Sequence, residues 1–348
     1  MRAGTIVFLV LIIGACNKKP VEPISPGQYD HGVFVLNEGL FEQNNASISF
    51  YDGAEDYQLI FKSENGRGLG DTANDFEAYT INGRDYIIVA VDVSSQVEII
   101  DRSTMSSVAQ IPMFNDGEPR SPRRILVEGP RAYVCNFDGT VSVIDLITNT
   151  VVATIEVGAN PDTMVLIEEE LFVANSGGLL FPIYDSTISV INTATYEVIE
   201  TIETRINPTE MVGDDHGDIY MISRGNYDDI PSALLRIDVA TRTVVETTEK
   251  AMSSLTKIDD WLYYYDQDNQ GLYRYNMTTE TFEESEILNL SDYETFLGFH
   301  YDPITNLFYV VDGNGYVNSS TIHVYDDTGI AIDSFTGGLN STDLIFQN

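Results

Sequence analysis

Polar residues recur at matching places in the sequence, each at the end of a short apolar segment, and together they could form a ligand-binding surface. The clearest pair is the Asn that ends AYVCN (132–136) and the Asn that ends LFVAN (171–175). The full set is Asn37, Asp92, Asn136, Asn175, Ser223, Asp266 and Asp312. Amides, hydroxyls and carboxylates can donate or accept hydrogen bonds to a polar ligand. A second interpretation stays open, in which each side chain caps its own loop by bonding the nearby backbone.

Residues capable of catalysis form no recognisable group. The four histidines, His31, His216, His300 and His323, lack the spacing of metal ligands. The sequence has no nucleophile motif. GRGLGD (66–71) resembles a Gly-rich phosphate-binding loop, but no predicted helix follows it to bind a phosphate at its N-terminus. DQDN (266–269) offers too few oxygen ligands for a calcium loop. We therefore predict a binding protein and not an enzyme, with no cofactor and no metal ion.

The elements that position the polar set are short β-strands in a repeat. The apolar segments are VFVLN (33–37), YIIVAVD (86–92), AYVCN (132–136), LFVAN (171–175), IYMIS (219–223), LYYYD (262–266) and LFYVV (307–311). Their alternating apolar, β-branched and aromatic residues indicate strands. A leading strand such as 161–169 precedes the best segments, and two further strand-like runs follow them. Seven units of four antiparallel strands predict an all-β fold, the seven-bladed β-propeller.

The two ends of the chain predict how the ring closes. STDLIFQN (341–348) looks like a leading strand without the rest of its blade, and the first unit, near Val33, lacks a leading strand. We expect the C-terminal strand to pair into blade one, which leaves no free sheet edge. The propeller then spans residues 32–348.

The loops of the propeller predict which face binds a ligand. Turns between the third and fourth strands are short and alike, whereas loops between the second and third strands are long and varied. Long, varied loops on a rigid scaffold usually carry binding residues. Besides the polar set, these loops carry further candidate ligand contacts: Phe41, Phe137, Phe181, Tyr184, Arg224, Tyr227, Tyr265 and Tyr316.

The charge balance excludes some partners. Fifty-four acidic residues against eighteen basic ones give a formal net charge of −36. Such a surface repels phosphate backbones, so we expect no nucleic-acid partner. It also disfavours a strongly anionic ligand unless Arg67, Arg120 and Arg224 form a local positive patch.

The N-terminus predicts export and a lipid anchor. Residues 1–16 combine a basic start, an apolar segment and IGAC, which resembles a bacterial lipobox with Cys16 as the lipidated residue. Residues 17–31 are polar and Pro-rich and suit a flexible tether. We expect the protein to be held at a membrane by its lipid alone. Cys135 is then the remaining thiol, predicted as a small buried residue.

Two resemblances narrow the function. The repeats at 132–161 and 171–208 resemble the YVTN-type propeller family. VFVLNEGLFEQNNASISFYD (33–52) and residues 70–101 are similar to propeller lipoproteins of Bacteroidetes encoded beside TonB-dependent receptors, among them the BtuG-type vitamin B12 capture proteins. This resemblance implies a lipoprotein of the outer membrane, at the cell surface or on the periplasmic face. It also implies binding of a corrinoid such as cobalamin and its delivery to a TonB-dependent outer-membrane transporter. Another transported ligand (a siderophore, haem or a glycan) is the alternative, and a propeller hydrolase such as a lactonase is a further one.

Overall fold

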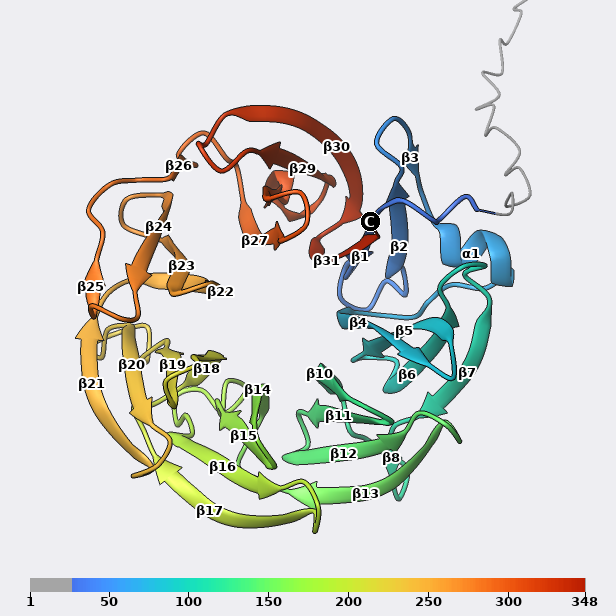
Figure 1. Ribbon diagram of the computed structural model, residues 1–348. Helices are drawn as coiled ribbons and strands as arrows, with labels where there is room; N and C mark the ends of the chain where they lie inside the picture. The colour runs from blue at the N-terminus through green and yellow to red at the C-terminus, as the bar shows by residue number, and fades with distance from the viewer. Residues whose placement is uncertain (1–26, 348) are drawn as a thin grey trace, which may run out of the picture.

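The structure is a computed structural model that describes residues 27–347, and its strands form seven blades around a central axis (Figure 1). From the axis outward, blade one contains β31 (Ser341–Gln347), β1 (Gly32–Asn37), β2 (Ser47–Tyr51) and β3 (Asp56–Tyr57). Blade two contains β4 (Ala73–Ile81), β5 (Arg84–Val91), β6 (Gln96–Asp101) and β7 (Ser107–Pro112). Blade three contains β10 (Pro122–Glu128), β11 (Arg131–Asn136), β12 (Thr140–Asp145) and β13 (Thr150–Glu156).

The remaining blades follow the same order around the ring. Blade four contains β14 (Pro161–Ile167), β15 (Glu170–Asn175), β16 (Thr187–Asn192) and β17 (Glu197–Glu203). Blade five contains β18 (Pro208–Gly213), β19 (Asp218–Ser223), β20 (Ala233–Asp238) and β21 (Thr243–Glu249). Blade six contains β22 (Met252–Ile258), β23 (Trp261–Asp266), β24 (Gly271–Asn276) and β25 (Thr281–Phe282). Blade seven contains β27 (Phe296–Asp302), β28 (Leu307–Asp312), β29 (Ser319–Tyr325) and β30 (Ala331–Leu339). The predicted seven-bladed propeller with four antiparallel strands per blade is confirmed.

The ring closes as predicted. β31 is the innermost strand of blade one and pairs antiparallel with β1, placing Val33 opposite Phe346 and Val35 opposite Leu344. Because the last strand of the chain joins the first blade, both edges that would otherwise be free form backbone hydrogen bonds with each other.

The hydrophobic core lies between neighbouring blades. Tyr133 and Cys135 of β11 pack with Leu171 and Val173 of β15, and all four side chains are buried. The second strand of a blade contacts a neighbouring blade on each side, which explains why its residues are apolar almost without alternation. Cys135 is a buried free thiol, in agreement with its predicted role.

Several short elements were not expected. α1 (Ile60–Asn65) follows the two-residue strand β3 and covers blade one with Ile60 and Phe61, both buried. A small hairpin, β8 (Phe114–Asn115) with β9 (Glu118–Pro119), leads into blade three. β26 (Leu288–Asn289) pairs with β24 beyond β25, so the outer strand of blade six is split, and η1 (Asn314–Tyr316) is a single 3₁₀ turn.

The predicted N-terminal features lie largely outside the described residues. These features are the signal peptide at 1–16 with Cys16 and the first part of the tether. Within residues 27–31, Tyr29 is buried against the rings of Phe34 and Phe50, so the packed domain begins before Gly32. Among residues 27–347, no helix is long and apolar enough to cross a membrane.

Candidate functional site

The varied loops gather on one face of the ring, which we call the loop face. In an antiparallel four-strand blade, the second-to-third loops and the connections entering the first strand lie at the same end of the sheet. The loop face therefore carries the loops after β15, β19, β23 and β28 together with the first residues of β18, β22 and β27. The short turns after the third strands lie on the opposite face.

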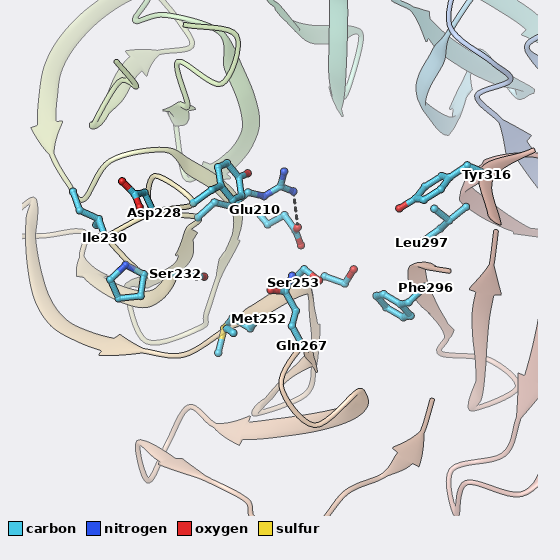
Figure 2. Close-up of a pocket in the computed structure, with 15 residues that line it drawn as sticks. Glu210, Asp228, Ile230, Ser232, Met252, Ser253, Gln267, Phe296, Leu297 and Tyr316 are labelled. Carbon is cyan, nitrogen blue, oxygen red and sulfur yellow. Dashed lines mark ion pairs between the residues drawn. The ribbon is translucent and has the colours of Figure 1, made fainter. Parts of the chain in front are cut away.

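A cavity of about 600 Å³ opens on the loop face between blades five, six and seven (Figure 2). Its polar wall includes Glu210, Arg224 and Gln267, and its apolar wall includes Phe296 and Leu297. The remaining lining residues are Tyr227, Asp228, Ile230, Pro231, Ser232, Ala251, Met252, Ser253, Ser254 and Tyr316. This volume and this mixture of aromatic and polar groups are typical of small-molecule sites.

Three of the predicted contacts, Arg224, Tyr227 and Tyr316, line this cavity. A fourth, Tyr265, stacks on the cavity residue Phe296 with ring centroids 3.9 Å apart, so it supports the wall from behind. Sequence reasoning missed Glu210, Ser253, Phe296 and Leu297, which belong to innermost strands. Their positions in the sequence could have identified them. These residues lie near the starts of leading strands, and those starts lie at the same end of each blade as the long loops.

Two more predicted aromatic residues continue the wall beyond the cavity rim. The ring of Tyr184 lies 6.3 Å from that of Tyr227, and the ring of Phe181 lies 6.3 Å from that of Tyr184, both edge to face. Phe181 at the loop tip is 73% exposed. The three rings form a continuous aromatic surface from the cavity to the solvent.

The predicted asparagines belong to the interior of the blades and not to the binding surface. Asn37, Asn136 and Asn175 are fully buried. Each Nδ2 donates to two hydroxyls of the adjacent third strand: Ser47 and Ser49, Thr140 and Ser142, and Thr187 and Ser189. Asn37 Oδ1 also accepts from Gly338 N at 2.6 Å and from Ser341 Oγ at 2.7 Å, which ties blade one to the ring closure. The interpretation as a ligand-binding rim is therefore corrected for these three residues.

The predicted acidic residues likewise bond to the protein itself. Asp266 is buried, pairs with Lys250 Nζ at 2.6 Å and accepts from the backbone N–H of Asn269. Asp312 is buried and accepts from the N–H groups of Thr295 and Asn314. Asp92 is partly buried and accepts from Asn74 Nδ2 at 3.2 Å. These carboxylates organise the loops instead of facing the cavity.

The last two aromatic candidates lie away from the cavity. Phe41 is 68% exposed on the loop of blade one. Phe137 is partly buried, and the guanidinium of Arg123 lies 5.2 Å from its ring centroid.

The suggested patch of Arg67, Arg120 and Arg224 does not form. Arg67 pairs with buried Glu98 at 2.6 Å, and Arg120 pairs with Asp138 at 3.0 Å. Instead, Arg123 Nε of β10 pairs with Asp162 at 3.2 Å, and Arg124 and Arg224 act on the same carboxylate through their charge. Burial alone would raise the pKa of Asp162, but these three guanidiniums hold it below its usual value.

Acidic residues of the inner strands bridge one blade to the next. Asp75 accepts from Ile125 N at 2.6 Å, Glu77 accepts from Val127 N at 2.8 Å, and Glu210 accepts from Leu255 N at 2.8 Å. Burial raises the pKa of Glu77 to about 8 and also raises that of Asp75, beside Asp343. Burial lowers the pKa of His300 to about 4, so its imidazole is neutral near pH 7.

Comparison with known proteins places the chain in a family. Residues 31–336 match the sequence profile of a family described as a domain of unknown function, DUF5074. The chain belongs to the DUF5074 family. No protein with a curated description matches this DUF5074 protein significantly.

Solved structures share the fold of this DUF5074 protein at low sequence identity. Hydrazine synthase of Kuenenia stuttgartiensis is 17% identical with a TM-score of 0.60, over 74% of this chain and 85% of that one. A "quinonprotein alcohol dehydrogenase-like protein" of Bacteroides thetaiotaomicron is 14% identical with a TM-score of 0.63, over 92% and 79%. The computationally designed Ika8 protein is 13% identical with a TM-score of 0.56, over 92% of each chain. These similarities describe the fold alone.

The lining of the cavity in this DUF5074 protein can contact both apolar and polar parts of a ligand. The residues from 27 to 347 contain no group of three or more His, Cys, Asp or Glu placed to hold a metal ion. The cavity combines flat aromatic surface, an ion pair and neutral hydrogen-bonding groups such as Gln267 and Ser253. Such a set can orient a ligand that has both apolar and polar parts.

Proposed function

We propose that this protein binds a corrinoid such as cobalamin at the loop-face cavity and delivers it to a TonB-dependent outer-membrane transporter. The observation that carries the proposal is the cavity of about 600 Å³, whose wall includes the predicted contacts Arg224, Tyr227 and Tyr316. The identity of the ligand and the transporter partner come from the resemblance at 33–52 and 70–101. The lipid anchor at Cys16 would hold the propeller at the outer membrane, at the cell surface or on its periplasmic face.

The chemistry of a corrinoid suits this wall. A corrinoid has broad apolar faces and a rim of amides, so aromatic rings and neutral polar groups can contact it together. Because it is larger than a drug-sized molecule, it would lie partly in the cavity and partly against the rings of Tyr184 and Phe181. Its small net charge tolerates the formal charge of −36 on the protein.

The direct test mixes the protein with cyanocobalamin and separates bound from free ligand by gel filtration. We expect red absorbance to elute with the protein at about one equivalent. Elution of all the colour as free ligand would reject a corrinoid as the cargo.

A binding module for another transported ligand is the second candidate. The aromatic surface of Phe181, Tyr184 and Tyr227 favours it, because flat rings also stack on haem or on sugar faces. Equilibrium titration with haemin, a ferric siderophore and a set of oligosaccharides separates this candidate from the first. Hydrolase activity is a third alternative, and the absence of enzymatic activity stays a prediction, which a panel of lactone and ester substrates tests.

A further inference from the structure

We propose that the cavity contains a subsite for one anionic group, a phosphate or a carboxylate, centred on the guanidinium of Arg224. This inference rests on the proposed function, because it assigns the part of the ligand that the polar wall of the cavity recognises. The ligand class that follows is a molecule with a bulky apolar body and a single anionic group.

The guanidinium of Arg224 bonds to the Tyr227 side chain but keeps further donors available for a ligand. Its side chain is 41% exposed and lines the cavity. Its ion pair with Glu210, Nη2 to Oε1, is 3.5 Å long, beyond the usual length of an N–H···O hydrogen bond (Figure 2). A guanidinium carries five N–H donors in a planar fork that fits a phosphate or carboxylate.

Glu210 is held in place by a bond to the neighbouring blade. Its Oε2 accepts from the backbone N–H of Leu255 in the next blade at 2.8 Å. Glu210 therefore bridges β18 to β22 and has a structural role without a tight pairing to Arg224. An anion can approach Arg224 while this backbone bond stays intact.

The local charge also favours an anion at Arg224. Arg123 Nε pairs with Asp162 at 3.2 Å, and the positive charges of Arg124 and Arg224 also lower the pKa of this carboxylate. Two carboxylates, Glu210 and Asp228, also line the cavity. The positive charge of these guanidiniums offsets negative charge that would otherwise repel an anionic group.

The wall opposite Arg224 is apolar. Phe296, Leu297 and Tyr316 lie together across the same cavity (Figure 2). A ligand that filled both sides would place its apolar body against these residues and its anionic group at Arg224. Cobalamin belongs to this class because its nucleotide loop contains one phosphodiester, and so do aromatic phosphates and carboxylates.

The experiment compares paired ligands that differ at the anionic group. Cyanocobalamin and cobinamide, which lacks the phosphate and nucleotide, are titrated calorimetrically into the wild type, R224Q and R224K. We expect R224Q to weaken the binding of cyanocobalamin by about 10- to 100-fold, as for loss of a charged hydrogen bond. The binding of cobinamide should weaken by less than about 2-fold. R224K should give an intermediate loss because an ammonium cannot bond in a planar fork. Arg84→Gln, an exposed arginine at the start of β5 on the opposite face, is the control and should change neither affinity.

Two further measurements test the subsite independently of the identity of the ligand. If wild type binds no corrinoid, the corrinoid proposal fails, and 2-naphthyl phosphate against 2-naphthol then tests the subsite alone. We expect wild type, but not R224Q, to prefer the phosphate. Glu210→Gln can still accept a hydrogen bond from Leu255 N. This variant should bind the anionic member of either ligand pair several-fold more tightly than wild type. Equal losses for both members of a pair on R224Q, or no preference for the anionic member in wild type, would overturn the subsite.

Discussion

At the residue scale, Tyr227 and Tyr316 are the side chains that the account depends on most. They line the cavity from blades five and seven and are 70% and 55% exposed, so a ligand can bury them. We expect Tyr227→Ala and Tyr316→Ala each to weaken ligand binding by about 1–3 kcal/mol, as at buried aromatic contacts. Calorimetric titration with cyanocobalamin measures this loss.

The matched control for these tyrosines is Ile304→Ala. Ile304 is at least as exposed as either tyrosine but lies in the turn between β27 and β28 on the opposite face. Its removal should leave the affinity unchanged. An equal loss of affinity from Ile304→Ala would show that the binding face is wrongly assigned.

For the buried asparagines we expect a mutation to lower stability and to leave ligand affinity unchanged. Asn136 donates to the hydroxyls of Thr140 and Ser142 inside blade three. Asn136→Ala should lower the free energy of unfolding by about 1–3 kcal/mol, because buried polar groups lose their partner. Urea denaturation measures this change, and the affinity of the folded variant for its ligand should not change. A variant with wild-type stability but weaker ligand binding would show that Asn136 contacts the ligand.

The sequence contained a signal for this structural role. In blades one, three and four, the third strand carries two Ser or Thr residues, spaced two positions apart, opposite the buried Asn. These pairs are Ser47 and Ser49, Thr140 and Ser142, and Thr187 and Ser189. Hydroxyls that face a buried amide satisfy it without a ligand. The repeat alone could not show this, because burial depends on how closely the neighbouring blade packs.

At the scale of the elements, β31 is the strand on which ring closure depends. It supplies the innermost strand of blade one, and its residues Leu344 and Ile345 are buried. Deleting residues 341–348 should sharply lower the thermal midpoint, because β1 would lose its partner and both cores beside blade one would be exposed. A chain ending at Phe346 is the control and should melt close to wild type. An unchanged melt after the larger deletion would contradict closure by this strand.

The strands were more predictable than the cavity. Alternating residues and the period of the repeat identify seven blades, and the incomplete units at the two ends identify the closure. The cavity depends instead on which loops leave space between them, and that space lies between blades five, six and seven, away from Phe41 and Phe137. α1 was missed because six residues give too short a periodic pattern to distinguish a helix from a loop.

At the scale of the whole molecule, the acidic residues that bridge the blades make stability depend on pH. Burial raises the pKa of Glu77 from 4.5 to about 8, and the charges of Asp75 and Asp343 act in the same direction, against the hydrogen bond from Val127 N. Between these values the folded state keeps a proton that the unfolded chain has lost, so stability falls as pH rises from about 4.5 to about 8.

We expect the urea midpoint to fall between pH 5 and pH 8, and Glu77→Gln to make this fall shallower. The amide of Gln can still accept from Val127 N but has no proton to lose. As pH rises, the growing negative charge of the chain also lowers its stability. The quantity to measure is therefore the difference between the urea midpoints of wild type and variant at each pH. Identical pH profiles for the two proteins would show that Glu77 titrates normally.

The central claim is that a ligand is captured at the loop face between blades five, six and seven, and hydrogen–deuterium exchange with and without cyanocobalamin tests it most directly. We expect slower exchange in the loops at 224–232, 267–270 and 313–318 and no change in the turns at 146–149 and 239–242 on the opposite face. Protection of those turns, or no protection at saturating ligand, would contradict it.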